Sequence, residues 1–310
     1  MPARRHLRTA AAVVLAATVT ALLPVAAADA ATQAPRTVNG TKGNGLTISD
    51  GTPYVVMNGT RVDFGVIVRD LAWNPSGTKA AFVDGSGNLD VANANGSGRV
   101  TVAKNPGGGQ TWSHPTWQVA PADKPDGVVA KDNLIFAVGK AGVTRLETVP
   151  ATDHDGTPKL LPLEHYSGDG VLPLPTTYNT WPDAGGPVGS SVYENTRTGD
   201  VYVRDDYIRQ QGGALLAGSE PALSPNGEEV VFVRSIAGHD HIFEAALNTA
   251  KPVARDLTPH GTSYYTEPTW SPNGATIAFR TPTGTDTIPA TGTHTPVQVS
   301  TYTGLAAYRG

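Results

Sequence analysis

Acidic and imidazole side chains recur at one position of a repeated sequence pattern. Asp70, His114, Tyr178, Glu220 and Glu267 each precede a tryptophan or leucine by three positions. If the repeats fold alike around one axis, these side chains form a ring that attracts a cation or a basic peptide segment. The same groups include the acid and the base that a hydrolase or lyase needs. Alternatively, each acid accepts backbone N–H bonds within its own repeat.

Two other clusters carry residue types that bind metals. His239 and His241 stand two apart, so on a strand they share one face and could share a transition metal. The alternative for this stretch is a solvated polar turn. Asp153 and Asp155, followed by Gly156, are similar to the start of a calcium loop, but the next positions lack further oxygen ligands. We therefore predict no cofactor and leave a bound divalent cation open.

The elements that must position these residues repeat along the chain. Asp70–Gly77, Glu220–Gly227 and Glu267–Gly274 are near-copies, with a weaker copy at His114–Gln118 and another centred on Trp181. The marker positions 73, 117, 181, 223 and 270 are 44, 64, 42 and 47 residues apart. Three of these spacings fall in the range of a four-stranded propeller blade.

Each repeat continues with further strand signals, which indicate an all-β fold. A short β-branched segment follows the turn, as at Lys79–Val83, Glu229–Val233 and Thr276–Phe279. Two more strands follow, joined by a Gly- or Asn-rich hairpin. We predict a β-propeller of six four-stranded blades, whose closing blade is either incomplete or shared by strands from both ends of the chain. Five blades with an N-terminal cap is the alternative.

The repeat resembles the WD40-like β-propeller repeat of the TolB family. That repeat carries an acidic residue, a proline, a tryptophan and a Ser-Pro-Asp-Gly turn, followed by a strand that ends in Ala-Phe. Trp270–Gly274 with Ile277–Phe279 matches this pattern, and Asn93–Gly98 matches the family's hairpin. Ser76, Asn226 and Asn273 replace the turn aspartate and preserve a turn. The resemblance implies a six-bladed propeller and a protein-binding role.

Most residues of the motif have structural roles that need no ligand. The predicted wedges between neighbouring blades are Trp73, Trp117 and Trp270, with Leu223 at the same position. Phe82, Phe232 and Phe279 are expected to face the same interior. Only the ring position therefore carries a functional question.

The chain begins with the features of a secretory signal peptide. Arg4, Arg5 and Arg8 precede the apolar run Thr9–Val25, and Ala28–Ala30 offers a cleavage site after residue 30. We predict a flexible segment at 31–43 and the propeller at 44–310, with an insertion at about 151–186. The mature chain is expected to be extracellular, with association to the cell wall as an alternative, and to contain no membrane span.

Composition narrows the function classes. The chain has no cysteine and a formal net charge of −4, so we expect no disulfides and no nucleic-acid partner. The sequence contains no P-loop, zinc-protease helix or serine-nucleophile elbow. We predict a monomeric, non-catalytic propeller that binds a protein, peptide or cell-envelope component through one face and the insertion. The alternative is a propeller lyase or hydrolase using the ring residues.

Overall fold

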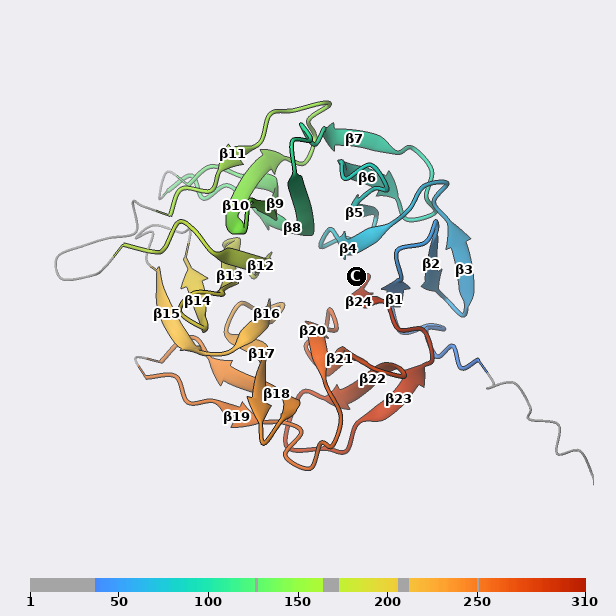
Figure 1. Cartoon of the computed structure of the whole chain (residues 1–310), viewed down its shortest axis with the longest axis vertical. Helices are drawn as coiled ribbons and strands as arrows, with labels where there is room; N and C mark the ends of the chain where they lie inside the picture. Colours follow the sequence, from blue (N-terminus) through green and yellow to red (C-terminus); the bar gives the residue numbers. More distant parts are fainter. Residues whose placement is uncertain (1–36, 126–127, 164–172, 206–211, 250) are drawn as a thin grey trace, which may run out of the picture. The chain divides into compact units, whose positions relative to one another are not determined.

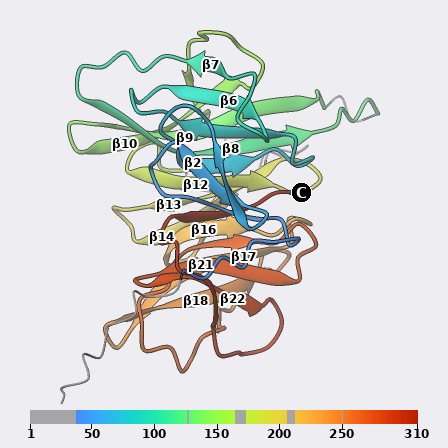
Figure 2. The same ribbon diagram turned by 90° about the vertical axis from the view of Figure 1, so that its right-hand side faces the viewer.

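The chain forms a ring of six blades around a central axis. The computed structural model describes residues 37–125, 128–163, 173–205, 212–249 and 251–310. Within these residues every blade is an antiparallel sheet of four strands, and Figures 1 and 2 show the ring from two directions. The predicted all-β propeller with six blades is therefore confirmed, and the five-bladed alternative is wrong.

Five blades follow one another along the chain, each with its first strand innermost. Blade 1 contains β4 (Arg69–Trp73), β5 (Lys79–Val83), β6 (Leu89–Asn93) and β7 (Val100–Ala103). Blade 2 contains β8 (Gln110–Ala120), β9 (Lys131–Lys140), β10 (Val143–Pro150) and β11 (Lys159–Leu160). Blade 3 contains β12 (Asn179–Gly185), β13 (Ser190–Asn195), β14 (Asp200–Arg204) and β15 (Gly212–Ala217). Blade 4 contains β16 (Ser219–Leu223), β17 (Glu229–Ile236), β18 (His239–Ala246) and β19 (Arg255–Asp256). Blade 5 contains β20 (Thr266–Trp270), β21 (Thr276–Thr281), β22 (Gly284–Pro289) and β23 (Val297–Ser300).

Blade 6 closes the ring with strands from distant parts of the sequence. Its strands are β24 (Leu305–Tyr308), β1 (Leu46–Ser49), β2 (Tyr54–Met57) and β3 (Thr60–Asp63). The innermost strand β24 pairs antiparallel with β1, as shown by Ile48 opposite Ala306. This pairing joins red and blue segments in Figure 1 and is the predicted closure.

The core lies between blades rather than within a single sheet. The described residues contain six apolar clusters, each shared by two neighbouring blades. Phe82, Phe232 and Phe279 are completely buried, as predicted. Because each sheet buries its faces against its neighbours, no blade is stable without the next.

The tryptophan wedges also form hydrogen bonds between blades. The indole N–H of Trp117 donates to the carbonyl of Ala72 at 3.1 Å, and that of Trp270 donates to Ala222 at 3.1 Å. In both cases the acceptor belongs to the inner strand of the preceding blade. The predicted structural role of these residues is confirmed.

The turn after the inner strand of blade 5 explains the Pro-x-Gly signature. In blade 5 the N–H of Gly274 donates to the carbonyl of Ser271 at 2.8 Å, and Gly274 has a φ of +69°. A left-handed residue of this kind favours glycine. The side-chain oxygen of Asn273 accepts the N–H of Ala275, so asparagine serves the turn where the TolB repeat has aspartate.

The insertion between blades 2 and 3 is shorter than the predicted range of 151–186, because part of this range forms blade strands. Its middle supplies β11, and its end supplies β12, the inner strand of blade 3. Leu161, Leu163 and Leu174 are buried between blades 2 and 3. Residues 164–172 lie outside the described residues, as do 1–36, which include the predicted signal peptide. The described part of the chain contains no helix with the length and apolarity needed to cross a membrane.

Candidate functional site

A repeated backbone irregularity places the ring residues near the axis. The inner strands of blades 1 to 5 each contain a β-bulge close to their first residue. One bulge residue in each strand has a positive φ, and these residues are Asp70 (54°), His114 (50°), Trp181 (48°), Glu220 (51°) and Glu267 (57°). A left-handed conformation costs a residue with a side chain about 1–2 kcal/mol, so its repetition marks a position that the fold holds firmly.

The position in blade 3 differs from the sequence prediction. Trp181 occupies the bulge, whereas Tyr178 lies before β12, where its ring is 5.1 Å from the guanidinium of Arg197. The repeat in blade 3 is therefore shifted by three residues, and Ala184 stands where the other blades have tryptophan or leucine. Tyr178 is thus removed from the ring and Trp181 joins it.

The acids of the ring hold the backbone of the next blade. Asp70 accepts the N–H of His114 at 3.1 Å, and Glu220 accepts the N–H of Glu267 at 2.6 Å. Between blades 3 and 4, Glu194 of β13 plays this part by accepting the N–H of Glu220 at 3.3 Å. The predicted alternative of acids bound to backbone N–H groups is right in kind, but the bonds cross to the neighbouring blade. We call Glu194, Glu220, Glu267 and Asp70 the acidic arc.

Glu267 is the least satisfied member of the acidic arc. Its residue is 9% exposed, Oε1 lies 2.9 Å from Nη1 of Arg280, and Oε2 has no hydrogen-bond partner among the described residues. Burial, opposed by Arg280 and assisted by the charges of Glu220 and Asp70, raises the pKa of Glu267 to about 7. Burial likewise raises the pKa of Glu220 and of Glu194.

His114 and Trp181 face each other at the same level of the channel. Their ring centroids are 3.6 Å apart, and Nδ1 of His114 is buried without a hydrogen-bond partner among the described residues. Burial lowers the pKa of His114, and the nearby Asp70 opposes this shift. The imidazole is therefore neutral at pH 7, with one ring nitrogen available as an acceptor.

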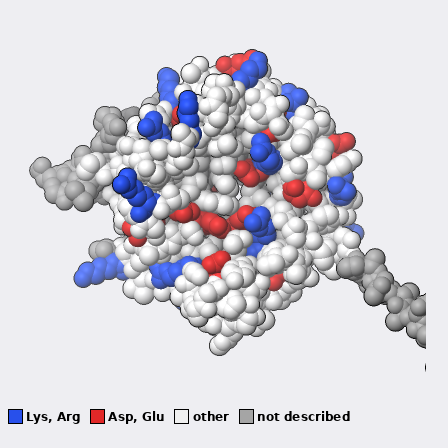
Figure 3. All heavy atoms as spheres, in the orientation of Figure 1, with Lys and Arg blue, Asp and Glu red and all other residues white. Residues whose placement is uncertain are grey.

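Two cavities lie on the axis and share Asp70, His114 and Leu305. The mouth pocket has a volume of about 200 Å³ and lies where the inner strands begin; its lining residues include Asp50, Arg69, Glu267 and Arg280. In the space-filling view, Asp and Glu atoms gather around the centre of the ring, with Lys or Arg atoms beside them (Figure 3). This end of the channel is the predicted mouth.

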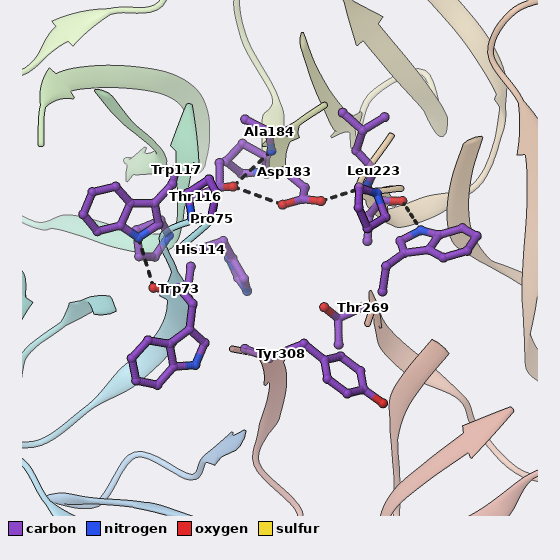
Figure 4. A pocket seen from close by; sticks show the side chains of 18 of the residues that line it. Trp73, Pro75, His114, Thr116, Trp117, Asp183, Ala184, Leu223, Thr269 and Tyr308 are labelled. Atoms are coloured by element: carbon purple, nitrogen blue, oxygen red, sulfur yellow. Dashed lines mark hydrogen bonds between the residues drawn. The ribbon is translucent and has the colours of Figure 1, made fainter. Parts of the chain in front are cut away.

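The channel cavity extends from the ring residues toward the Pro-x-Gly turns. It has a volume of about 350 Å³, and its wall contains Trp117, Trp270 and several prolines. Figure 4 shows His114 pointing into it and Asp183 held between Thr116 and Leu223. Asp183 accepts the hydroxyl of Thr116 at 3.0 Å and the N–H of Leu223 at 2.7 Å. Burial raises its pKa to about 6, and these bonds oppose the rise.

The histidines proposed as metal ligands lie in blade 4. His241 is buried, and its Nδ1 is 2.9 Å from Oδ2 of Asp256. His239 contacts the ring of Tyr264 at a centroid distance of 5.8 Å. The described residues contain no group of three or more His, Asp or Glu side chains placed to hold a metal ion. The metal assignment stays a prediction without a third ligand.

Sequence reasoning identified four of the five bulge residues and missed some of their partners. Trp181 carried a local signal, because a proline follows the bulge residue in blades 2 to 5 and Pro182 follows Trp181. Glu194 and Asp183 carried no repeat signal, because their acidic side chains do not recur at the equivalent positions of the other blades. Arg280 stands one residue after the predicted Phe279, but nothing in the sequence pairs it with Glu267.

Glu267 gives the stability of the protein a defined pH dependence. Its folded-state pKa of about 7 lies above the normal 4.5, so the folded state holds the proton more tightly and is favoured at low pH. We expect this contribution to the free energy of unfolding to be lost as pH rises from about 4.5 to about 7. Glu267→Gln should remove this part of the pH dependence. Urea unfolding at pH 5, 6, 7 and 8 measures it. If the unfolding free energies of wild type and variant change with pH in parallel, Glu267 does not cause the pH dependence. The control is Glu228→Gln, in the turn at the far end of β16.

Solved structures with the same fold include two TolB proteins. The chain is similar to TolB from Acinetobacter baumannii, with a TM-score of 0.59, 16% identity, and coverage of 88% of this chain and 68% of that one. A putative TolB from Agrobacterium tumefaciens gives a TM-score of 0.54 and 17% identity, with coverage of 80% of this chain and 86% of that one. The chain has a TolB-like fold. The resemblance predicted from the repeats is therefore confirmed at the level of the fold.

The TolB-like fold by itself does not define an activity. A gluconolactonase from Xanthomonas campestris is also similar, with a TM-score of 0.55, 13% identity, and coverage of 86% of this chain and 83% of that one. No model of a known protein family matches the sequence, and no curated protein matches it. Function must therefore be argued from the site.

Proposed function

We propose that the chain is a non-catalytic binding protein whose acidic arc receives a positively charged segment of another protein. The observation that carries this proposal is the excess of carboxylates at the mouth. Glu220 lies near enough to Glu194 and Asp240 for their charges to raise its pKa, and Arg280 opposes them. Carboxylates that raise one another's pKa form a surface that is complementary to a cationic ligand.

The hydrogen bonds of the acidic arc support binding rather than catalysis. Asp70, Glu194 and Glu220 each accept a backbone N–H from a neighbouring bulge. These carboxylates are fixed in place by the ring itself, so a ligand meets a preorganised surface and less entropy is lost on binding. A catalytic carboxylate, by contrast, must be free to move a proton at the reacting atoms.

The setting of this interaction is also a proposal. The predicted signal peptide supports export, and the partner is then a secreted or cell-envelope protein. The segment that leads into β12 reaches the mouth end of the inner strand of blade 3. Deleting 151–186 would remove β11, β12 and buried leucines, so point substitutions test the binding face better than that deletion.

The proposal predicts charge-selective peptide binding at the mouth. We expect a fluorescent ten-residue peptide of alternating Lys and Gly to bind, and the matching Glu-Gly and Ser-Gly peptides not to bind. Glu194→Gln with Glu220→Gln should weaken binding about five-fold, as expected for two partly exposed charge pairs. The amide oxygens can still accept the backbone N–H groups. Fluorescence anisotropy at two salt concentrations measures the effect.

The matched control for this experiment lies at the opposite end of the ring. Glu228 follows the turn after β16, and Glu228→Gln removes the same charge away from the mouth. The proposal fails if all three peptides bind alike, or if the mouth and control variants behave alike.

A propeller enzyme is the second candidate, favoured by one observation. Glu267, with a raised pKa, and a neutral His114 line the same pocket and could exchange a proton with a substrate. The similarity to a gluconolactonase makes lactones the first substrates to try. Hydrolysis of glucono-δ-lactone with and without divalent metal, abolished by Glu267→Gln, would support this candidate. Rates equal to the buffer blank would remove it.

A further inference from the structure

The mouth pocket contains two buried polar atoms that lack partners. Oε2 of Glu267 and Nδ1 of His114 make no hydrogen bond within the described residues, and both residues line this pocket. A buried polar atom without a partner costs about 1–3 kcal/mol, and Nδ1 of His114 is an acceptor in the tautomer that carries its proton on Nε2. Two such atoms in the lining of one cavity point to a ligand that donates hydrogen bonds to both.

The charges around the pocket select a cation. The lining holds three carboxylates, those of Asp50, Asp70 and Glu267, and two arginines. Of the two arginines in the lining, Arg280 pairs with Oε1 of Glu267 and Arg69 donates to the backbone carbonyl of Asp84. A further positive donor would stabilise Oε2.

The geometry favours an ammonium over a guanidinium. Arginine binds carboxylates best through both oxygens, but Arg280 already occupies Oε1 of Glu267. One oxygen remains, which suits the point charge and three rotatable donors of an ammonium. A pocket of about 200 Å³ is several times the roughly 30 Å³ that one water occupies, so it has room for an alkyl chain as well.

We propose that the mouth pocket is a socket for a primary alkylammonium group, supplied by a lysine side chain of the partner, with Glu267 Oε2 and His114 Nδ1 as its acceptors. This inference rests on the proposed function, because it names the group that the acidic arc receives. A free amine carries the same chemistry, so the experiment separates the two sources.

The test uses the whole mature chain and small probes. Isothermal titration compares Nα-acetyl-lysine methylamide with its arginine and norleucine counterparts. We expect the lysine probe to bind about ten-fold more tightly than either, the ratio of one charge-assisted hydrogen bond. Glu267→Gln should abolish this preference, and Glu228→Gln should keep it. An arginine probe that binds as tightly as lysine, or a Glu267→Gln variant that keeps the preference, overturns the proposal.

A second measurement does not depend on any variant. In the wild-type protein, the ¹⁵N chemical shift of His114 Nδ1 should move on titration with the lysine probe, because this atom becomes an acceptor. No movement at saturation contradicts the assignment. Butylammonium that binds as tightly as a Lys-Gly peptide would assign the pocket to free amines and overturn a partner lysine as the source.

The two proposals fail in different ways. If Lys-Gly and Arg-Gly peptides bind equally and both depend on Glu194 and Glu220, the acidic arc binds basic segments and the lysine socket is wrong. If neither peptide binds while the lysine probe still depends on Glu267, the pocket binds an ammonium group, but a partner lysine as its source is wrong.

Discussion

Trp270→Ala is expected to lower the free energy of unfolding by about 3–5 kcal/mol, the usual cost of truncating a buried tryptophan. Trp270 is 6% exposed and packs with Ile277 of its own blade and Ala222 and Val231 of blade 4. Alanine removes this wedge and also leaves the carbonyl of Ala222 without the indole donor. Because the wedge joins two blades, the loss affects the whole ring. Urea unfolding followed by circular dichroism measures it.

Two milder substitutions separate packing from hydrogen bonding at this position. Trp270→Phe keeps a ring and loses the N–H, so it should cost about 1–2 kcal/mol. The cost of Trp270→Leu in unfolding free energy should lie between those of the phenylalanine and alanine variants, because blade 4 already carries Leu223 at the equivalent place. If alanine and phenylalanine cost the same, the hydrogen bond and not the wedge holds the blades together.

The repeat pattern predicted the architecture because its residues recur in several blades. Tryptophan, the Pro-x-Gly turn and phenylalanine occupy equivalent places in blades 1 and 5, so one copy supports the interpretation of the other. Closure by both ends of the chain was predicted for a different reason. The sequence also indicates a strand pair at 54–68 with only Leu46–Ile48 ahead of it, and a ring without free edges requires this blade to be completed.

The site was harder to predict because its partners come from single blades. In blade 3, Ala184 occupies the position of the tryptophan marker. Trp181, three residues earlier, was therefore aligned with the wrong position of the repeat. A bulge shifts the register by an amount that no local pattern records, since it depends on pairing with the next strand. The left-handed conformation of five inner-strand residues is likewise a tertiary feature, and glutamate has no preference for it.

The acidic arc combines a structural and a functional role in the same atoms. Each carboxylate that fixes a neighbouring bulge contributes charge to the mouth, and burial raises the pKa of Glu194 and of Glu220. Glu267 differs because the next blade offers it no bulge. The inner strand of blade 6 has no positive-φ residue at Leu305, so Oε2 of Glu267 is left without a donor. The irregular closing blade therefore leaves Glu267 as the acidic-arc carboxylate with an unpartnered buried oxygen, which is where the proposed ligand is expected to bind.

Asp183→Ala is expected to cost about 3 kcal/mol, because it leaves the N–H of Leu223 and the hydroxyl of Thr116 without their acceptor. These donors belong to blades 4 and 2, so Asp183 joins three blades at the channel wall. Thr116 Oγ1 also accepts the N–H of Ala184, and loss of the carboxylate would disturb that bond too.

Asp183→Asn separates this connecting role from the charge. The amide oxygen can accept the N–H of Leu223 while the NH₂ group donates to Thr116, so we expect a cost below about 1 kcal/mol at pH 7. Asp183 has a folded-state pKa of about 6 against a normal 3.8, so its contribution to stability is complete below pH 3.8 and is lost as pH rises to about 6. Asparagine should remove that decline. Unfolding free energies at pH 4, 5, 6 and 7 test both statements. An asparagine variant as unstable as alanine would show that the negative charge itself, and not the hydrogen-bonded connection between blades, stabilises the ring.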